Sequence, residues 1–151
     1  MVEVMLKSVK ALDILEIRQK LLRPTGTLEN CIFPEDNDIS TIHFASYLQQ
    51  NITSIVSLIN SPFPHKPSSN DWQIRAMATL PEYRKMGYAT SLLEQCILHS
   101  TSKQSNTLWC NARRHAVSFY QKFGFVMIGE EFNISDVGPH FLMKFSPKDK
   151  S

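Results

Sequence analysis

Residues 80–89 read Leu-Pro-Glu-Tyr-Arg-Lys-Met-Gly-Tyr-Ala, and this stretch carries the strongest structural signal in the chain. Apolar and polar residues alternate before it over residues 72–79, which is typical of a strand. After it, apolar residues recur at the spacing of one helix face: Ala89, Leu92, Leu93, Cys96 and Ile97. The stretch therefore predicts a strand that turns at Gly87 into an amphipathic helix.

Such a turn is suited to binding an anion. The first amides of a helix have no acceptor within the helix, and the aligned peptide dipoles place about half a positive charge there. Gly87 allows close approach of the backbone, and Arg84 and Lys85 add charge, each worth about 1 kcal/mol or less at an exposed site. The alternative is a turn that uses glycine for its geometry alone. Neither G-x-x-x-x-G-K-[ST] nor G-x-G-x-x-G occurs, so the nucleotide-binding fingerprints are missing.

The rest of the chain predicts alternating strands and helices. The N-terminal part indicates a strand over residues 1–7, a helix over 11–22, a long loop over 23–40 with one helical turn, and a hairpin of strands 41–49 and 52–59 around Gln50-Asn51. The C-terminal part indicates a strand over 108–111, a helix over 116–123 capped by Gly124, and strands over 125–132 and 140–145 around a turn at 135–139. Residues 61–70 are proline-rich and predict a surface loop.

This order, β-α-β-β-β-α-β-α-β-β, predicts one α/β domain spanning residues 1–151, with a mixed central sheet of about six to seven strands flanked by helices. The composition agrees, because 42% hydrophobic and 20% charged residues are typical of globular proteins. The net charge of +2 gives no reason to expect a nucleic-acid partner. We expect no membrane span, because no apolar run approaches about 18 residues.

The three cysteines form no CxxC pair, so we expect reduced core residues of a cytoplasmic protein and no metal site: Cys31, Cys96 and Cys110.

Two blocks of sequence resemble the signatures of the GNAT superfamily of N-acyltransferases. They are M-A-T-L-P-E-Y-R-K-M-G-Y-A-T-S-L-L, residues 77–93, and L-W-C-N-A-R-R-H-A-V-S-F-Y-Q-K-F-G-F, residues 108–125. The resemblance is most specific over residues 72–145 and weaker over residues 1–70. It implies transfer of an acetyl group from acetyl-CoA to a primary amine of a small molecule or peptide, by direct attack in a ternary complex without a metal. One alternative is a module of the same fold that binds CoA without turnover. Another is an interaction protein that docks through the loop Pro62–Pro67.

The resemblance also implies which residues hold acetyl-CoA. Its pyrophosphate would lie on Arg84, Lys85, Met86, Gly87, Tyr88 and Ala89. Backbone groups of Met77 and Thr79 would pair with the pantetheine arm as with an added strand. Asn111 matches a cofactor-contacting position, and a helix N-cap is an equally good reason for asparagine there.

For catalysis the resemblance implies that Tyr120 protonates the departing thiolate, which suits a phenol with a pKa near 10 and a thiol near 8.5. The alternative is a core aromatic residue. The amine must lose a proton, and we rank His140 first as base because its ordinary pKa is near 6.5. A chain of waters or one of four carboxylates are the other candidates: Glu29, Asp36, Asp38 and Glu131. The acids of the 23–40 loop are also candidates for receiving a cationic amine. The sequence leaves the acceptor and the oligomeric state open, a homodimer included.

Overall fold

The computed structural model describes residues 4–135 and 137–147. Its residues divide into two compact units. The first unit comprises Met1–Ile59 and Arg75–Cys96, and the second comprises Asn60–Ile74 and Ile97–Ser151. Strand β4 (Asp71–Thr79) and helix α2 (Tyr88–Ser102) each have residues in both units.

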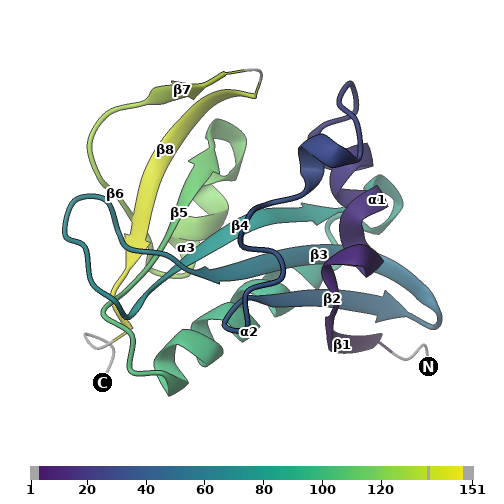
Figure 1. Cartoon of the computed structure of the whole chain (residues 1–151), viewed down its shortest axis with the longest axis horizontal. Helices are drawn as coiled ribbons and strands as arrows, with labels where there is room; N and C mark the ends of the chain where they lie inside the picture. Colours follow the sequence, from purple (N-terminus) through teal and green to yellow (C-terminus); the bar gives the residue numbers. More distant parts are fainter. Residues whose placement is uncertain (1–3, 136, 148–151) are drawn as a thin grey trace. The chain divides into compact units, whose positions relative to one another are not determined.

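The first unit is built on strands in the order β1-β2-β3-β4, in which β2 is antiparallel to both β1 and β3 (Figure 1). Its elements before β4 are β1 (Val4–Val9), α1 (Ala11–Leu22), the 3-10 turn η1 (Glu29–Cys31), β2 (Ile42–Leu48) and β3 (Asn51–Asn60). Leu6 pairs with Ser46 in β2, and Phe44 pairs with Val56 in β3. The helix and the two hairpin strands lie where the sequence predicts them. The hairpin turn falls one residue earlier than expected, because Gln49 takes the left-handed conformation with φ of 57°.

Helix α1 packs its apolar face on these strands. Ile14 is fully buried and contacts Ala45 and Ile55, and half-buried apolar residues surround this cluster. At the start of the helix, the amide of Lys10 donates to the Asp13 carboxylate at 3.0 Å. The helix ends at Leu22, two residues before Pro24, as expected for a residue that cannot continue a helix.

The same face of α1 carries Arg18, a charged side chain that is only 1% exposed. Its guanidinium forms a bidentate ion pair with Asp36, with Nη1 2.8 Å from Oδ2 and Nη2 3.1 Å from Oδ1. It also donates to the Cys31 carbonyl at 2.7 Å and to Ser57 Oγ at 2.9 Å. His43 lies 2.7 Å from Ser57 Oγ and 2.9 Å from the Asp36 carbonyl. The network joins α1, the 23–40 loop, β2 and β3, which explains why a long loop is held in one place.

This network shows that Asp36 does not fit the role of an amine-receiving carboxylate. Its side chain is buried and its two oxygens are used by Arg18, while the Phe33 amide donates to Oδ2 at 2.9 Å. The sequence could not show this, because the partner is 18 residues away. Glu29 and Asp38 are exposed, so their carboxylates are open to solvent.

The second unit has the strand order β4-β5-β8-β6, with β7 paired to β8 (Figure 1). Its further elements are β5 (Thr107–Arg113), the 3-10 turn η3 (Arg114–Ala116), α3 (Val117–Lys122), β6 (Val126–Met127), β7 (Phe132–Ile134) and β8 (Gly138–Phe145). Parallel pairing of Asp71–Ile74 with Thr107–Cys110, beside antiparallel pairing of β5 with β8, makes the sheet mixed as predicted. A cluster of Phe63, Trp109 and Leu142 forms part of the core. Gly124, with φ of 96°, follows the short helix α3 as the expected left-handed residue.

One predicted strand, residues 125–132, is wrong as a single element and is replaced by β6 and β7. Met127 pairs with Met143, and Phe132 pairs with His140. Five positions separate the first residue of each pair, but only three separate their partners on β8, so the chain must loop out between them. Gly129, with φ of 79°, lies in this loop. The described part of the chain therefore has eight strands, one more than the upper end of the expected range.

The Arg18–Asp36 pair predicts a large loss of stability when one partner is removed. Asp36→Asn should lower the free energy of unfolding by about 3–5 kcal/mol, because Arg18 would stay buried without a counter-charge. Urea denaturation measures this loss. Asp38→Asn, an exposed acid in the same loop, is the control and should change stability by about 0.5 kcal/mol or less.

The pH dependence of this contribution has a definite sign. Burial raises the pKa of Asp36, but hydrogen bonds from Arg18 and the Phe33 amide, with the charges of Arg18 and His43, bring it below its ordinary value. A depressed folded pKa gives stability that is present above the unfolded pKa, about 3.9, and is lost as the pH falls through the folded pKa. The stability gap between wild type and Asp36→Asn should therefore narrow in acid. A gap that stays constant would contradict the pair's assigned role.

We propose that the two units unfold together as one domain. Trp72 and Trp109 both lie in the second unit, whereas Asp36→Asn changes the first. Tryptophan fluorescence and far-UV circular dichroism of Asp36→Asn should then show one shared midpoint, lowered equally for both probes. A fluorescence midpoint that keeps its wild-type value would show that the units unfold independently.

Candidate functional site

Strand β4 leads to the predicted anion-binding turn through an irregular backbone. Ala76 has φ of 55°, a left-handed conformation that is uncommon for any residue except glycine. Beyond the strand, the Leu80 amide donates to the Thr53 carbonyl at 2.9 Å, and the 3-10 turn η2 (Pro81–Tyr83) follows. Arg84 Nε then donates back to the Thr79 carbonyl at 3.2 Å. These bonds fix where the backbone enters the turn.

The turn itself is exposed and contains two left-handed residues, Lys85 with φ of 63° and Gly87 with φ of 87°. Left-handed residues in a turn aim neighbouring amides into a common concavity, which is how backbone nests bind anions. A Cβ built on Gly87 would meet no atom within 4 Å. The space beside Gly87 is therefore open, and the positive φ is the observed reason that glycine suits this position.

Helix α2 begins directly after Gly87. The first bond of the helix runs from the Ser91 amide to the Gly87 carbonyl at 3.1 Å, and Ser91 Oγ donates to the same oxygen at 3.2 Å. The amides of residues 88–90 precede this bond and have no acceptor one turn back. Tyr88 anchors the helix start, because it is buried and its ring meets Tyr83 edge to face at 6.0 Å. Free amides, a helix dipole and two exposed cationic side chains fit a diphosphate group.

Met77 and Thr79, the residues expected to pair with a pantetheine arm, are half-buried in the same β4 segment between Ala76 and Leu80. Their role stays a prediction. The first unit thus contains both the predicted pyrophosphate turn and the strand that leads into it.

Asn111 lies in the second unit, half-buried in β5 opposite Leu142. The helix-cap explanation for this asparagine is wrong, because η3 starts at Arg114 and Arg113 occupies its cap position. Strand β5 runs through Asn111 to Arg113, so a side chain inside a strand needs another explanation.

Tyr120 is buried on α3 among aromatic rings, 5.4 Å from Phe119 and 5.3 Å from Phe125 between ring centroids. Its hydroxyl also forms a hydrogen bond with the Cys110 thiol. Burial raises the pKa of Cys110, and this hydrogen bond from Tyr120 opposes the rise. Packing in the aromatic core and a fixed hydroxyl direction are therefore combined in one residue. Neither the helical spacing nor the motif indicated the Cys110 partner.

One ring nitrogen of His140 is held by a hydrogen bond to the backbone. Its Nδ1 lies 2.8 Å from the Gly138 carbonyl, which can only accept, so Nδ1 donates a proton and Nε2 is the ring nitrogen left to accept one. The side chain is buried and its ring lies 6.1 Å from that of Phe132. Glu131, the other base candidate of this region, forms an ion pair with Arg114. The carboxylate of Glu131 thus already has a partner, and the Gly138 carbonyl fixes the Nδ1 side of the His140 ring.

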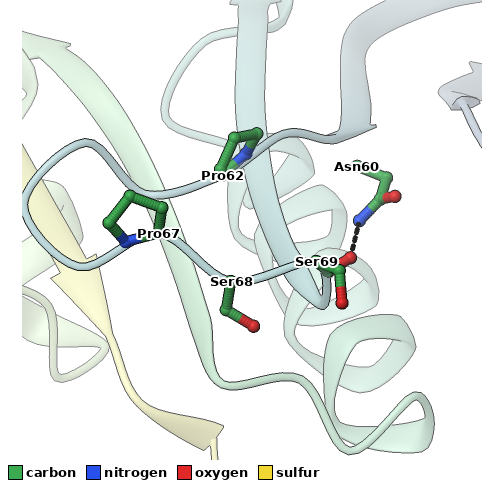
Figure 2. Close-up of a pocket in the computed structure, with 5 residues that line it drawn as sticks. All are labelled: Asn60, Pro62, Pro67, Ser68 and Ser69. Carbon is green, nitrogen blue, oxygen red and sulfur yellow. Dashed lines mark hydrogen bonds between the residues drawn. The ribbon is translucent and has the colours of Figure 1, made fainter.

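The proline-rich loop contains a separate cavity of about 410 Å³ in the second unit, lined by Asn60, Pro62, Pro67, Ser68 and Ser69. In Figure 2, Asn60 Nδ2 donates to the Ser69 carbonyl across this loop. Buried Asp71 closes the loop, since its Oδ2 accepts from the amides of Phe63 at 2.9 Å and Ser68 at 2.7 Å.

The loop's conformation disfavours docking through a PxxP motif. Pro64 lies in a turn in which the Lys66 amide donates to the Phe63 carbonyl at 3.3 Å. Docking domains bind PxxP as an extended polyproline helix, which this turn interrupts. None of the predicted site residues lines the cavity.

Two arginines were not predicted to take part in the site region. Arg18 lies within the predicted helix 11–22 and Arg75 within the alternating stretch 72–79, and the sequence marked neither as a site residue. Both guanidinium groups lie 3.9 Å from the centre of the Phe33 ring. A charged residue on an otherwise apolar helix face is a sequence signal that a buried partner exists, although it does not identify that partner.

The described residues, 4–135 and 137–147, contain no group of three or more histidine, cysteine, aspartate or glutamate side chains placed to bind a metal ion. No helix among them combines the length and the apolar character required to cross a bilayer.

Comparison with known proteins identifies the family. The family model described as an acetyltransferase (GNAT) domain matches residues 37–145. The uncharacterized N-acetyltransferase YitI of Bacillus subtilis (strain 168) is 31% identical over 137 residues, which cover 91% of this chain and 92% of that protein.

Solved structures show the same fold at low identity. The ribosomal-protein-S18-alanine N-acetyltransferase of Escherichia coli has a TM-score of 0.74 at 16% identity, covering 95% of this chain and 94% of that one. An aminoglycoside 6'-N-acetyltransferase complexed with coenzyme A has a TM-score of 0.72 at 15% identity, covering 95% of this chain and 97% of that one. The family match, together with the helix turn and strand described above, leads to one conclusion: the chain belongs to the GNAT family of acetyltransferases.

Proposed function

We propose that this protein transfers an acetyl group from acetyl-CoA to a primary amine. The observation that carries the proposal is the open, left-handed turn at Gly87, which leads into a 15-residue helix. Two exposed cationic side chains precede this glycine, and the first amides of the helix follow it. Such a helix start binds phosphate through its amides and its dipole. Membership of an acetyltransferase family and the resemblance of a CoA-bound structure support coenzyme A as the phosphate-bearing ligand.

In this proposal the amides of residues 88–90 bind the pyrophosphate, and Arg84 and Lys85 add charge around it. Backbone groups of Met77 and Thr79 bind the pantetheine arm. Bound acetyl-CoA supplies an acetyl group activated as a thioester. A backbone amide within residues 77–79 would donate to the thioester carbonyl oxygen, and such a preorganised donor contributes about 3 kcal/mol. Asn111 is the further proposed contact to the cofactor.

Proton transfer is assigned to two buried side chains. Tyr120 would donate its phenolic proton to the leaving sulfur, for which its hydroxyl would have to turn from Cys110 to the cofactor. His140 would accept a proton at Nε2, because Nδ1 is held by the Gly138 carbonyl. An amine with a pKa near 10.4 is mostly protonated at neutral pH and must lose a proton before it can attack.

Direct transfer to the amine fits the state of two buried thiols better than transfer through a covalent cysteine intermediate does. Burial raises the pKa of Cys96 to about 12. It also raises the pKa of Cys110, although the hydrogen bond from Tyr120 opposes it. A thiol that stays protonated is a poor nucleophile.

The role of Gly87 can be tested with a matched pair of glycine variants. Gly87→Ala should weaken CoA binding about tenfold or more, because the new methyl group would occupy the space beside the turn and oppose its left-handed conformation. Isothermal titration calorimetry with CoA measures the change. Gly129→Ala is the control: it has a similar φ of 79° and the same open surroundings, so it should lose comparable stability but no affinity.

CoA binding to the wild-type protein must be measured before the variants are compared. At a CoA concentration about a hundred times Kd, a genuine ligand should stabilise the fold by about 2.7 kcal/mol. Absence of any heat or stabilisation with CoA would refute the proposed function. Equal affinity of the two alanine variants would instead show that the phosphate lies elsewhere.

The proton-transfer roles predict a specific kinetic change. Tyr120→Phe should lower kcat by about a hundredfold while leaving CoA affinity within about twofold, because the ring remains but the proton donor is lost. Tyr47→Phe, in a half-buried tyrosine of β2, is the control and should leave kcat unchanged. His140→Gln should lower kcat, because the side chain proposed to accept the proton of the amine is lost.

Turnover is measured with acetyl-CoA and a panel containing a peptide with N-terminal alanine, a polyamine and an aminoglycoside. Acetyl transfer by Tyr120→Phe at the wild-type rate would falsify the role of its hydroxyl. CoA binding without transfer to any amine would favour a binding module over an enzyme.

A further inference from the structure

The Phe33 ring lies between two arginines of the first unit. The guanidinium carbons of Arg18 and Arg75 are each 3.9 Å from the centre of this ring. Two guanidinium groups cannot share that position over one face, so they cover opposite faces. The two residues after Pro34 complete the arrangement, because Asp36 pairs with Arg18 and Glu35 lies 3.8 Å from Arg75 Nη1.

Arg75 directly precedes the strained residue of β4. Ala76 has φ of 55°, and an L-amino acid keeps this conformation only where its surroundings impose it. On the far side, Ala78 packs against the cluster of Ile14, Ala45 and Ile55. The Leu80 amide then bonds to the Thr53 carbonyl at 2.9 Å. The backbone after Ala76 is therefore anchored. Before it, the pairing of β4 with β5 reaches Ile74, and the contact with Phe33 holds the one residue between, Arg75.

We propose that Phe33 and Glu35, by holding the side chain of Arg75, keep Ala76 in its left-handed conformation and thereby position the Met77–Thr79 backbone for the acyl donor. We call Phe33, Glu35 and Arg75 the Arg75 clamp. Arg75 is in this sense a positioning residue, since it acts through the backbone that follows it. The inference rests on the proposed function, because it assigns a purpose to the segment that is proposed to bind pantetheine.

The Arg75 clamp also connects the 23–40 loop to strand β4 within the first unit. The 23–40 loop is long and mostly exposed, yet its residues 33–36 are held by Arg18 on α1 and by Arg75 on β4. A change in the loop at Phe33 would therefore reach β4 without any contact to the ligand. The coupling is carried by side chains in direct contact.

Removing the clamp should weaken CoA binding in a manner that a glycine can reverse. Arg75→Met keeps much of the side-chain length but loses the planar cation, and we expect Kd for CoA to rise about five- to thirtyfold. Arg75→Lys should also weaken binding, since an ammonium group does not stack on the ring as a guanidinium does. Calorimetry with CoA on the full chain measures both.

The decisive variant is Arg75→Met combined with Ala76→Gly. Glycine adopts the left-handed conformation at no steric cost, so the double variant should recover most of the lost affinity. A role of Arg75 in stability alone would give no such recovery. Phe33→Leu removes the aromatic partner of the same contact and should weaken CoA binding as Arg75→Met does. If Arg75→Met fails to fold, recovery of CoA affinity in Phe33→Leu combined with Ala76→Gly provides the same test.

The matched control is Lys7→Met. Lys7 Nζ lies 5.1 Å from the centre of the Tyr47 ring, so this change removes another cation–aromatic contact of the first unit away from β4, and it should leave Kd unchanged. CoA binding to wild type must be present first, and its absence would count against the proposed function. If the wild type binds CoA, two results would refute the proposed role of the Arg75 clamp. One is that folded Arg75→Met binds CoA as tightly as the wild type, and the other is that adding Ala76→Gly restores no affinity.

Discussion

The buried ion pair between Arg18 and Asp36 is the interaction on which the arrangement of the first unit depends. A guanidinium that is 1% exposed is tolerable only if its charge is paired and its donors are used. Asp36, the Cys31 carbonyl and Ser57 meet that requirement from the loop and from β3. Because these partners come from separate elements, the pair defines one position of the 23–40 loop relative to α1 and the strands. The stacking of Phe33 on Arg75 follows from that position.

At the Gly87 turn the positive charge is partial and belongs to the backbone, whereas the Arg18–Asp36 pair joins two fully charged side chains. The charge of the turn comes from backbone amides whose positions are set by left-handed residues and by the first bonds of α2. In the proposed site these groups would need no rearrangement to receive an anion, whereas the exposed side chains of Arg84 and Lys85 would lose conformational freedom on binding it. A backbone site of this type tolerates changes in its side chains but not in its glycine.

In the second unit, the residues proposed for proton transfer are also part of the core. Tyr120 packs among Phe119 and Phe125 while its hydroxyl meets Cys110, and His140 is buried with one ring nitrogen held by Gly138. Burial restricts both side chains to one orientation. The core and aromatic interpretation of Tyr120 therefore does not compete with a catalytic one, because the same packing that buries the ring directs the hydroxyl.

The sequence by itself determined the elements whose signal is local. Helical spacing located α1 and α2, alternation located β4, and the strand, glycine turn and helix of residues 72–97 defined the candidate phosphate site. The family resemblance rested on this stretch together with residues 108–125. Tertiary structure decided what depends on distant partners. Asp36 forms an ion pair with Arg18, and Arg75 stacks on Phe33. The expected strand at residues 125–132 divides into two because β8 has too few residues to pair with all of it. Local patterns report the preferences of neighbouring residues, whereas pairing of buried charges and strand register are settled only when segments far apart in the chain come together.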